Sequence, residues 1–169
     1  MHQNETAPIS IGGVFTVEHI RDGVLIDTWE APNLVCNEGL NHVLDTEFHG
    51  TTQVGTWYVG LFEGNYTPVS TVTAATITAA STECTAYDET VRQTYNEAAS
   101  ASQVTTNSAN KATFTINATK TIYGAFLVSA SAKSATTGVL FAATQFSASK
   151  AVVATDQLLV TYTITASSV

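Results

Sequence analysis

The sequence predicts an all-β fold: an antiparallel β-sandwich, jelly-roll or immunoglobulin-like, with one short α-helix near residues 38–49. Threonine occupies 29 of the 169 positions, and its β-branched side chain suits a pleated, half-wet surface. Charged residues make up only 12% of the chain, whereas soluble domains usually have about a quarter. Segments with alternating apolar and polar residues recur in the last third. This composition argues against coiled coils, disulfide-rich scaffolds and disordered chains.

The first strands are predicted to form a β-hairpin. Strand-like segments cover residues 14–20 and 24–30. The Asp22-Gly23 pair between them is typical of a tight hairpin turn.

The chain is expected to form one domain behind a short arm. Residues 1–11 are polar, and we expect a flexible N-terminal arm. Residues 12–169 have the length of a single β-sandwich domain, which can form a core without a disulfide or a metal. Cys36 and Cys84 stand alone, without a CxxC pair. We expect two small buried hydrophobic side chains, and the sequence also allows a disulfide between them.

One segment has helical periodicity. Asn37 is a residue type that caps helices, and Gly50 follows the last apolar residue. Between them, apolar residues recur at the spacing of one helix face: Leu40, Val43, Leu44 and Phe48. A short helix is therefore predicted near residues 38–49.

The middle of the chain alternates strands with connections. Residues 56–62 (TWYVGLF) are predicted as a strand, and residues 64–82 as a long loop with at most one turn of helix. Residues 84–95 are predicted as a strand whose charges suggest the edge of a sheet. Residues 96–109 are predicted as a connection of small residues.

The last third contains the most regular strands. Apolar residues alternate with Thr and Asn over residues 112–117, and with Thr over residues 158–165. The segments at residues 121–129 and 139–146 are apolar on both faces, as in a central strand. About eight strands result, which is typical of an antiparallel sandwich.

The formal net charge is −8 with two arginines, which argues against binding to nucleic acid or to an anionic membrane, because both need clustered Lys and Arg. No apolar run is long enough to span a membrane, and the first residues do not resemble a secretion signal. Residues 1–97 hold 13 acidic and two basic side chains, whereas residues 98–169 hold one acidic side chain and four lysines. The two halves either make a complementary contact between copies or with a partner, or interleave so that the asymmetry averages out.

Two clusters of ionisable residues are candidates for metal binding. One lies on the polar face of the predicted helix: His42, Asp45 and His49. Catalytic zinc helices place two histidines four residues apart, and that spacing is missing here. We therefore expect this face of the helix to be solvated. The other cluster is acidic and lacks the regular spacing and central Gly of a calcium loop: Glu83, Asp88 and Glu89. We expect a solvated edge strand there, and no catalytic, cofactor-binding or metal site.

Aromatic residues give a second functional possibility. Trp57, Tyr58 and Tyr66 can stack on a sugar, although aromatic residues in such a strand usually belong to the core. No catalytic motif for nucleophilic or phosphate chemistry is present in the sequence. A carboxylate pair in the manner of a glycosidase leaves no local motif, and acids such as Glu63 or Asp88 are its candidates.

Five stretches are distinctive when taken together: NLVCNEGLNHVLDTEFHG, TWYVGLFEG, KATFTINATKTIYGAFLVSAS, TGVLFAATQFS and DQLLVTYTITAS. Over residues 30–166 this pattern resembles a family of small structural proteins of tailed bacteriophages, the capsid decoration (cement) proteins. The resemblance lies in strand sequences and not in a catalytic motif. Similar stretches also occur in phage tail-associated proteins.

The resemblance implies a non-enzymatic virion protein on the capsid exterior. Such a protein binds the major capsid protein on the outer surface of the expanded head and stabilises it through protein–protein contacts. A homo-oligomer is implied, with a trimer favoured, and no cofactor. The alternative is a tail- or fibre-associated β-sandwich that recognises a host surface glycan.

Overall fold

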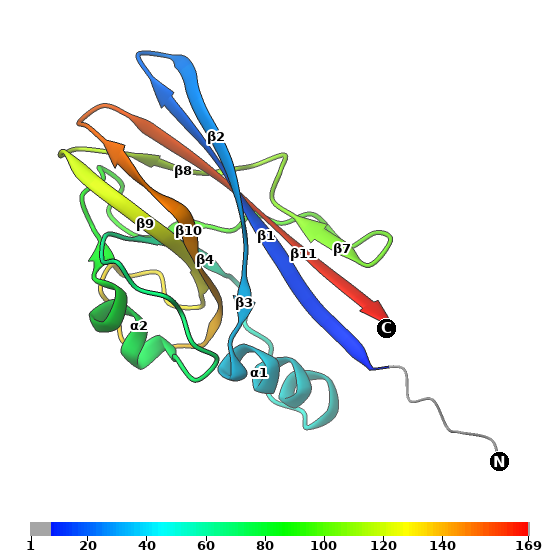
Figure 1. The fold of residues 1–169 in the computed structure, drawn as a ribbon. Helices are drawn as coiled ribbons and strands as arrows, with labels where there is room; N and C mark the ends of the chain where they lie inside the picture. The colour runs from blue at the N-terminus through cyan, green and yellow to red at the C-terminus, as the bar shows by residue number, and fades with distance from the viewer. Residues whose placement is uncertain (1–7, 169) are drawn as a thin grey trace.

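The computed structural model describes residues 8–168 and places two antiparallel sheets face to face (Figure 1). The sheets enclose a large apolar core, and the predicted all-β sandwich is confirmed. Among residues 8–168, no helix is long and apolar enough to cross a membrane.

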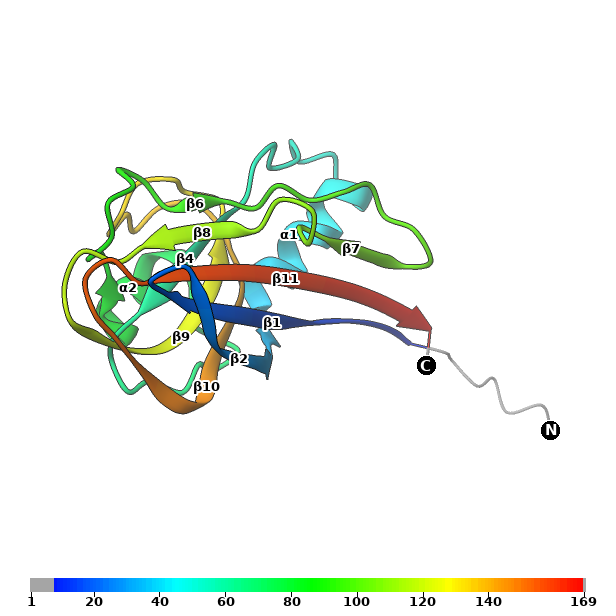
Figure 2. The same ribbon diagram turned by 90° about the horizontal axis from the view of Figure 1, so that it is seen from above.

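The first sheet is built on two long strands. β1 (Ile9–Arg21) and β11 (Gln157–Ser168) pair antiparallel along most of their length. β2 (Val24–Pro32) covers part of the other edge of β1. β7 (Val104–Thr106) and β8 (Ala112–Thr115) pair with successive parts of the far edge of β11 (Figure 2).

The second sheet is centred on β10, β9 and β4. Its strands are β3 (Leu34–Val35), β4 (Tyr58–Phe62), β5 (Glu83–Cys84), β6 (Gln93–Thr94), β9 (Lys120–Val128) and β10 (Leu140–Val152). β3 pairs with the outer edge of β10, and β5 and β6 pair with β4. β9 is buried over most of its length, as expected of a central strand.

The four strands predicted in the last third are β8, β9, β10 and β11. The last two extend further than predicted, to Val152 and Ser168. β7 lies within residues 96–109, which were predicted as a connection.

The β1–β2 hairpin forms as predicted. Asp22 and Gly23 have φ angles of 52° and 75°, a left-handed backbone that Asp and Gly tolerate better than most residues. β1 begins earlier than predicted, because Ile9 already pairs with Ser168. Residues 9–11 are therefore strand and not arm, and residues 1–7 of the predicted arm lie outside the described part of the chain.

The predicted helix is confirmed as α1 (Asn37–Phe48). Asn37 is the first residue of the helix and not its cap, so that detail of the prediction is wrong. Glu38 in the first turn accepts hydrogen bonds from the backbone N–H groups of Ala74, at 2.8 Å, and Leu140, at 2.6 Å. This carboxylate ties α1 to the start of the second helix and of β10.

The second helix, α2 (Ala74–Ser81), corrects the prediction of a loop with at most one helical turn over residues 64–82. Thr73 and Thr76 form a capping box at its start, in which the Thr73 N–H donates to Thr76 Oγ1 at 3.1 Å. Ile77 is fully buried. It is the one large apolar residue of the helix, so helical periodicity could not indicate α2.

The edge strand predicted over residues 84–95 forms only at its two ends, as β5 and β6. Near its end, Arg92 is fully buried and donates two hydrogen bonds of 2.8 Å to the carboxylate of Glu83. Arg92 also donates to the carbonyls of Ala130 and Ala135. The chain between β5 and β6 is irregular, and it brings Arg92 back to Glu83 to form this buried ion pair.

The acidic and basic halves of the sequence interleave in one fold, which was the second of the two explanations given for their charge asymmetry. β1 of the first half pairs with β11 of the second. Three of the four lysines of the second half bind acids of the first: Lys111 with Glu18, Lys120 with Glu63, and Lys150 with Asp27. Most of the lysines of the second half are thus paired with acids of the first half within the fold.

Both cysteines are buried and free, as predicted for small hydrophobic side chains. Burial raises the pKa of the Cys36 thiol to about 12 and also raises the pKa of Cys84. Both thiols are therefore protonated and unreactive at neutral pH.

Candidate functional site

The candidate metal ligands on α1 do not come together as a site. Asp45 and His49 are exposed, while the half-buried ring of His42 stands edge-on to Trp57 at 5.7 Å between ring centroids. Within residues 8–168, no group of three or more His, Cys, Asp or Glu side chains is arranged to hold a metal ion.

The acidic cluster is divided among three roles. Glu83 is buried against Arg92, so the expectation of a solvated side chain is wrong for this residue. Both carboxylate oxygens of Glu89 accept from the N–H of Thr115 at 3.1 Å. Asp88 is exposed. Two of these three acids thus stabilise the fold.

The candidate sugar-stacking residues pack into the protein. Trp57 is half-buried and stands edge-on to Phe141 at 5.7 Å, beside the main core cluster. Tyr66 packs against Phe62 of a second core cluster, with ring centroids 6.5 Å apart. Tyr58 is half-buried in β4. The side chains of Trp57 and Tyr66 serve separate clusters and do not share a stacking platform.

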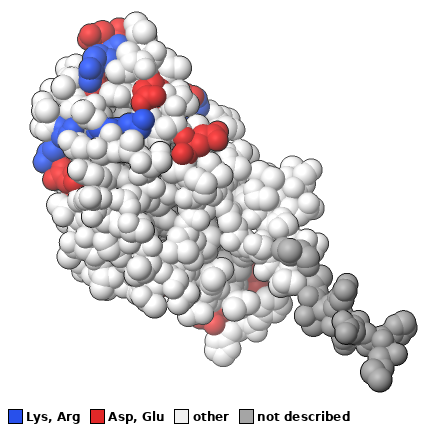
Figure 3. Space-filling model, in the orientation of Figure 1, with Lys and Arg blue, Asp and Glu red and all other residues white. Residues whose placement is uncertain are grey.

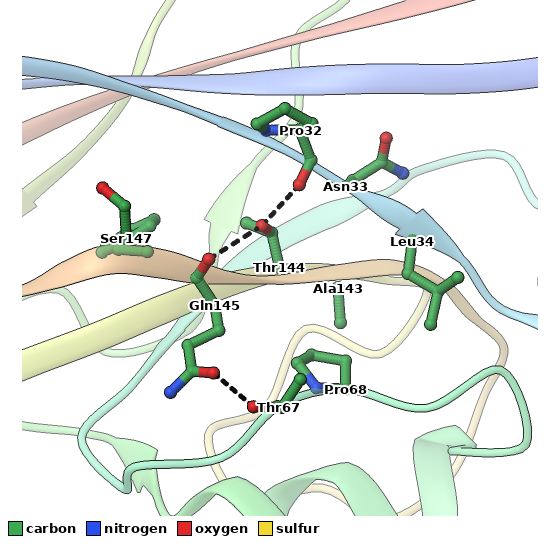
Figure 4. A pocket seen from close by; sticks show the side chains of 10 residues that line it. Pro32, Asn33, Leu34, Thr67, Pro68, Ala143, Thr144, Gln145 and Ser147 are labelled. Carbon is green, nitrogen blue, oxygen red and sulfur yellow. Dashed lines mark hydrogen bonds between the residues drawn. The ribbon is translucent and has the colours of Figure 1, made fainter.

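An open hollow of about 530 Å³ lies between β10 and the chain that leads from β2 to β3 (Figure 4). Several of its polar groups are already paired: Gln145 accepts from Thr67 and donates to Asn65, and Thr144 donates to the Pro32 carbonyl at 2.7 Å. Asn33 Nδ2 donates to the Tyr162 hydroxyl, whereas its buried Oδ1 accepts no hydrogen bond from residues 8–168. In the described part of the chain, no acidic, basic or cysteine side chain lines this hollow.

The distinctive surface lies where α1 runs beneath the start of β1 (Figure 1). Six apolar side chains surround a hollow of about 270 Å³, here called the apolar groove: Ile9, Ile11, Leu40, Val43, Leu44 and Phe48. Several are largely exposed, with exposed fractions of 79% for Ile9, 56% for Leu44 and 83% for Phe48. Large apolar side chains gathered on one surface mark a contact site for another protein more often than a free surface.

A second apolar hollow, of about 290 Å³, adjoins the groove and shares Ile11 and Val43 with it. Its other lining residues come mainly from β7 and the end of β11, including Val104, Ile164 and Ala166. Among residues 8–168, no Lys or Arg lines either hollow. The apolar surface therefore continues from α1 beneath the β1–β11 ribbon.

Charges are distributed unevenly over the surface. On the face seen in Figure 3, Lys and Arg gather in the upper part of the molecule, and none is visible over the lower part, where α1 lies. α1 itself carries the exposed acids Asp45 and Glu47, which form no salt bridge within residues 8–168. In sequence, these two acids are the neighbours of the groove residues Leu44 and Phe48.

The sequence indicated the residues of this surface but not their exposure. Helical periodicity identified the stripe of Leu40, Val43, Leu44 and Phe48, and such a stripe normally packs on the core. In the structure α1 contacts β10 and buries only Gly39 completely, so the outer part of the stripe stays in solvent. No local signal distinguishes a stripe that packs on its own core from one that binds another chain.

The fold and the groove together define a β-sandwich with an exposed apolar surface at one end. In comparisons with known proteins, the chain matches no family model and no curated sequence.

Proposed function

We propose that this chain is a capsid decoration protein of a tailed bacteriophage. In this role it binds the outer surface of the expanded head through protein–protein contacts and stabilises the shell. The proposal combines the resemblance of its strand sequences to that family with one structural observation, the apolar groove between α1 and β1.

The exposure of the groove carries the proposal. In the isolated chain, much of the apolar surface of Phe48 and Leu44 is exposed to water. Covering this surface contributes about 25 cal/mol of favourable binding free energy for each Å² removed from solvent. A protein partner that covers both hollows recovers this free energy. Threonine-rich strands around them carry few charges, so their desolvation is less costly than that of a charged surface.

The proposal predicts stoichiometric binding to heads. Purified expanded heads that lack the protein are incubated with increasing amounts of it and sedimented, and the bound protein is quantified. We expect saturation at a fixed ratio to the capsid subunit and a higher melting temperature of the heads in calorimetry.

Two leucines of matched exposure test the surface. Leu44 in the groove and Leu25 near the tip of the β1–β2 hairpin are 56% and 55% exposed. We expect Leu44→Gln to weaken head binding and Leu25→Gln to leave it unchanged. Heads that neither bind the protein nor gain stability would contradict the proposal. Binding to host cells that is lost in Tyr66→Ala would instead support the glycan-binding alternative.

A further inference from the structure

We propose that the edge of β1 at residues 9–11 accepts an extended segment of the binding partner as an additional strand. Within the described residues, β11 pairs with β1 from Ile9 onward, but β2 pairs only from Val14. On the β2 side, the first residues of β1 therefore have no neighbouring strand among residues 8–168. An incoming strand would occupy the position in the sheet that β2 leaves at Pro32.

The backbone groups of this edge point toward the open side. The Asn33 N–H donates to the Gly13 carbonyl at 3.0 Å, which shows that Gly13 faces the β2 side. Alternate residues of a strand face the same side, so the N–H and C=O groups of Ile9 and Ile11 point there too. The opposite strand agrees: Ala166, the partner of Ile11, donates its N–H away from β1, to Gln103 at 2.9 Å.

The side chains at this edge determine which segment fits. Ile9 and Ile11 face the apolar groove, with Leu44 and Phe48 of α1 on its other side. An added strand would place every second side chain over this groove. Apolar residues at alternate positions of the incoming segment are therefore required, while backbone hydrogen bonds supply affinity that does not depend on its sequence.

The acidic side chains of α1 favour a different protein, and not a second copy of this chain, as the source of the added strand. Asp45 and Glu47 are exposed neighbours of the groove residues Leu44 and Phe48 on α1, and they favour Lys or Arg beside the apolar residues of the segment. A second copy cannot readily supply these cations. Five of its six basic side chains are in salt bridges, and Lys133 donates to the carbonyls of Thr85 and Tyr87. The inferred occupant is thus an extended, alternately apolar segment with flanking basic residues; this rests on the proposed function, under which it belongs to a head subunit.

A proline substitution tests the backbone contribution when it is compared with Ile11→Ala, which shortens the same groove-lining side chain but keeps its N–H. Ile11→Pro removes an N–H that points out of the sheet, where proline is tolerated at an edge, and leaves the β11 side of the ladder intact. Glu30→Pro is the matched control, because Glu30 lies on the outer edge of β2, where the alternation also directs its N–H away from β1. We expect Ile11→Pro to weaken binding to expanded heads by about tenfold or more and Glu30→Pro to leave it unchanged.

Hydrogen–deuterium exchange on the wild-type protein provides a second measurement that needs no variant. Binding to heads should slow exchange of the Ile9 and Ile11 amides. If the wild type binds heads but these amides stay unprotected, or if Ile11→Pro binds normally, the strand-addition proposal is overturned and the proposed function stands. If the wild type does not bind heads, both fail. Sedimentation of the protein alone tests self-association: a dimer that protects the same amides would make the occupant a second copy and overturn the inferred partner.

Discussion

Arg21 donates two hydrogen bonds to the carboxylate of Asp156, from Nε at 2.8 Å and from Nη2 at 2.7 Å. Asp156 is fully buried in the turn between β10 and β11. His19 Nε2 lies 2.8 Å from the same carboxylate, and the Val153 N–H donates to it at 2.8 Å. One carboxylate therefore fastens the end of β1 to the turn that joins the two sheets.

Asp156→Asn is expected to lower the free energy of unfolding by about 3 kcal/mol, the low end for breaking a buried ion pair, because Arg21 is partly exposed and regains water. Urea denaturation measures the loss. Asp88→Asn, at an exposed acid, is the control and should change stability by less than about 0.5 kcal/mol. Equal effects of the two substitutions would show that the buried contacts are unimportant.

The same contacts predict how stability depends on pH. The hydrogen bonds from Arg21, assisted by Val153 and His19, hold the pKa of Asp156 well below its ordinary value of 3.8. A lowered folded-state pKa stabilises the protein at pH values above the ordinary one, and this contribution is lost as the pH falls below it. Wild-type unfolding free energy should therefore fall more steeply below about pH 4 than that of Asp156→Asn. Parallel curves for the two proteins would refute this assignment.

Removing Arg92 should be more damaging than removing any exposed charge. Its side chain is fully buried, and Arg92→Met would leave the carboxylate of Glu83 without a counter-ion, at a cost of about 3–5 kcal/mol. The double variant Arg92→Met/Glu83→Leu should recover part of this loss, because no charge then stays buried alone. Thermal or urea unfolding of the three proteins measures the effect. A double variant less stable than Arg92→Met would contradict the argument.

Much of the fold follows from local patterns. Asp22-Gly23 predicted the hairpin because few residue pairs suit its left-handed turn, and the apolar run of β9 predicted a central strand. Arg92 could not be foreseen as a core residue, since nothing near it in the sequence shows that Glu83 returns to pair with it. The pairing depends on the tertiary fold, which one-dimensional periodicity does not contain.

The groove shows the same limit. The sequence identified the apolar stripe of α1, but the exposure of Phe48 depends on how the start of β1 is placed relative to the helix. The open edge at Ile9 and Ile11 depends on where β2 ends, at Pro32. Both are relationships between segments far apart in the chain.

Two glycines of the β4–β9 pair each face an aromatic ring of the other strand. Gly60 lies opposite Phe126, and Gly124 lies opposite Phe62. A Cβ at Gly124 would overlap both the Phe62 ring and the backbone carbonyl of Thr144, whereas the three atoms nearest to a Cβ at Gly60 all belong to the Phe126 ring. A ring can shift more easily than backbone, so Gly124→Ala should lower the free energy of unfolding by more than Gly60→Ala. We expect a loss of about 1–3 kcal/mol for each substitution.

Gly55→Ala is the control for these glycines, because a Cβ there would meet nothing within 4 Å. Thermal unfolding should give wild-type stability for Gly55→Ala, a lower value for Gly60→Ala and the lowest for Gly124→Ala. Any other order would show that the close approach of backbone and ring does not determine the need for glycine.

Phe48→Ser distinguishes a contact surface from a core. The side chain is 83% exposed, so its loss should change the free energy of unfolding by less than about 0.5 kcal/mol. Phe15→Ser, at a fully buried ring stacked on Tyr162 at 4.1 Å, should cost at least about 3 kcal/mol. Denaturant unfolding separates the two. A large loss in Phe48→Ser would mean that this ring stabilises the isolated chain. Unchanged stability together with weaker head binding would mean that the Phe48 ring contributes to binding and not to folding. A side chain that contributes nothing to folding has its apolar area free for contact with a partner.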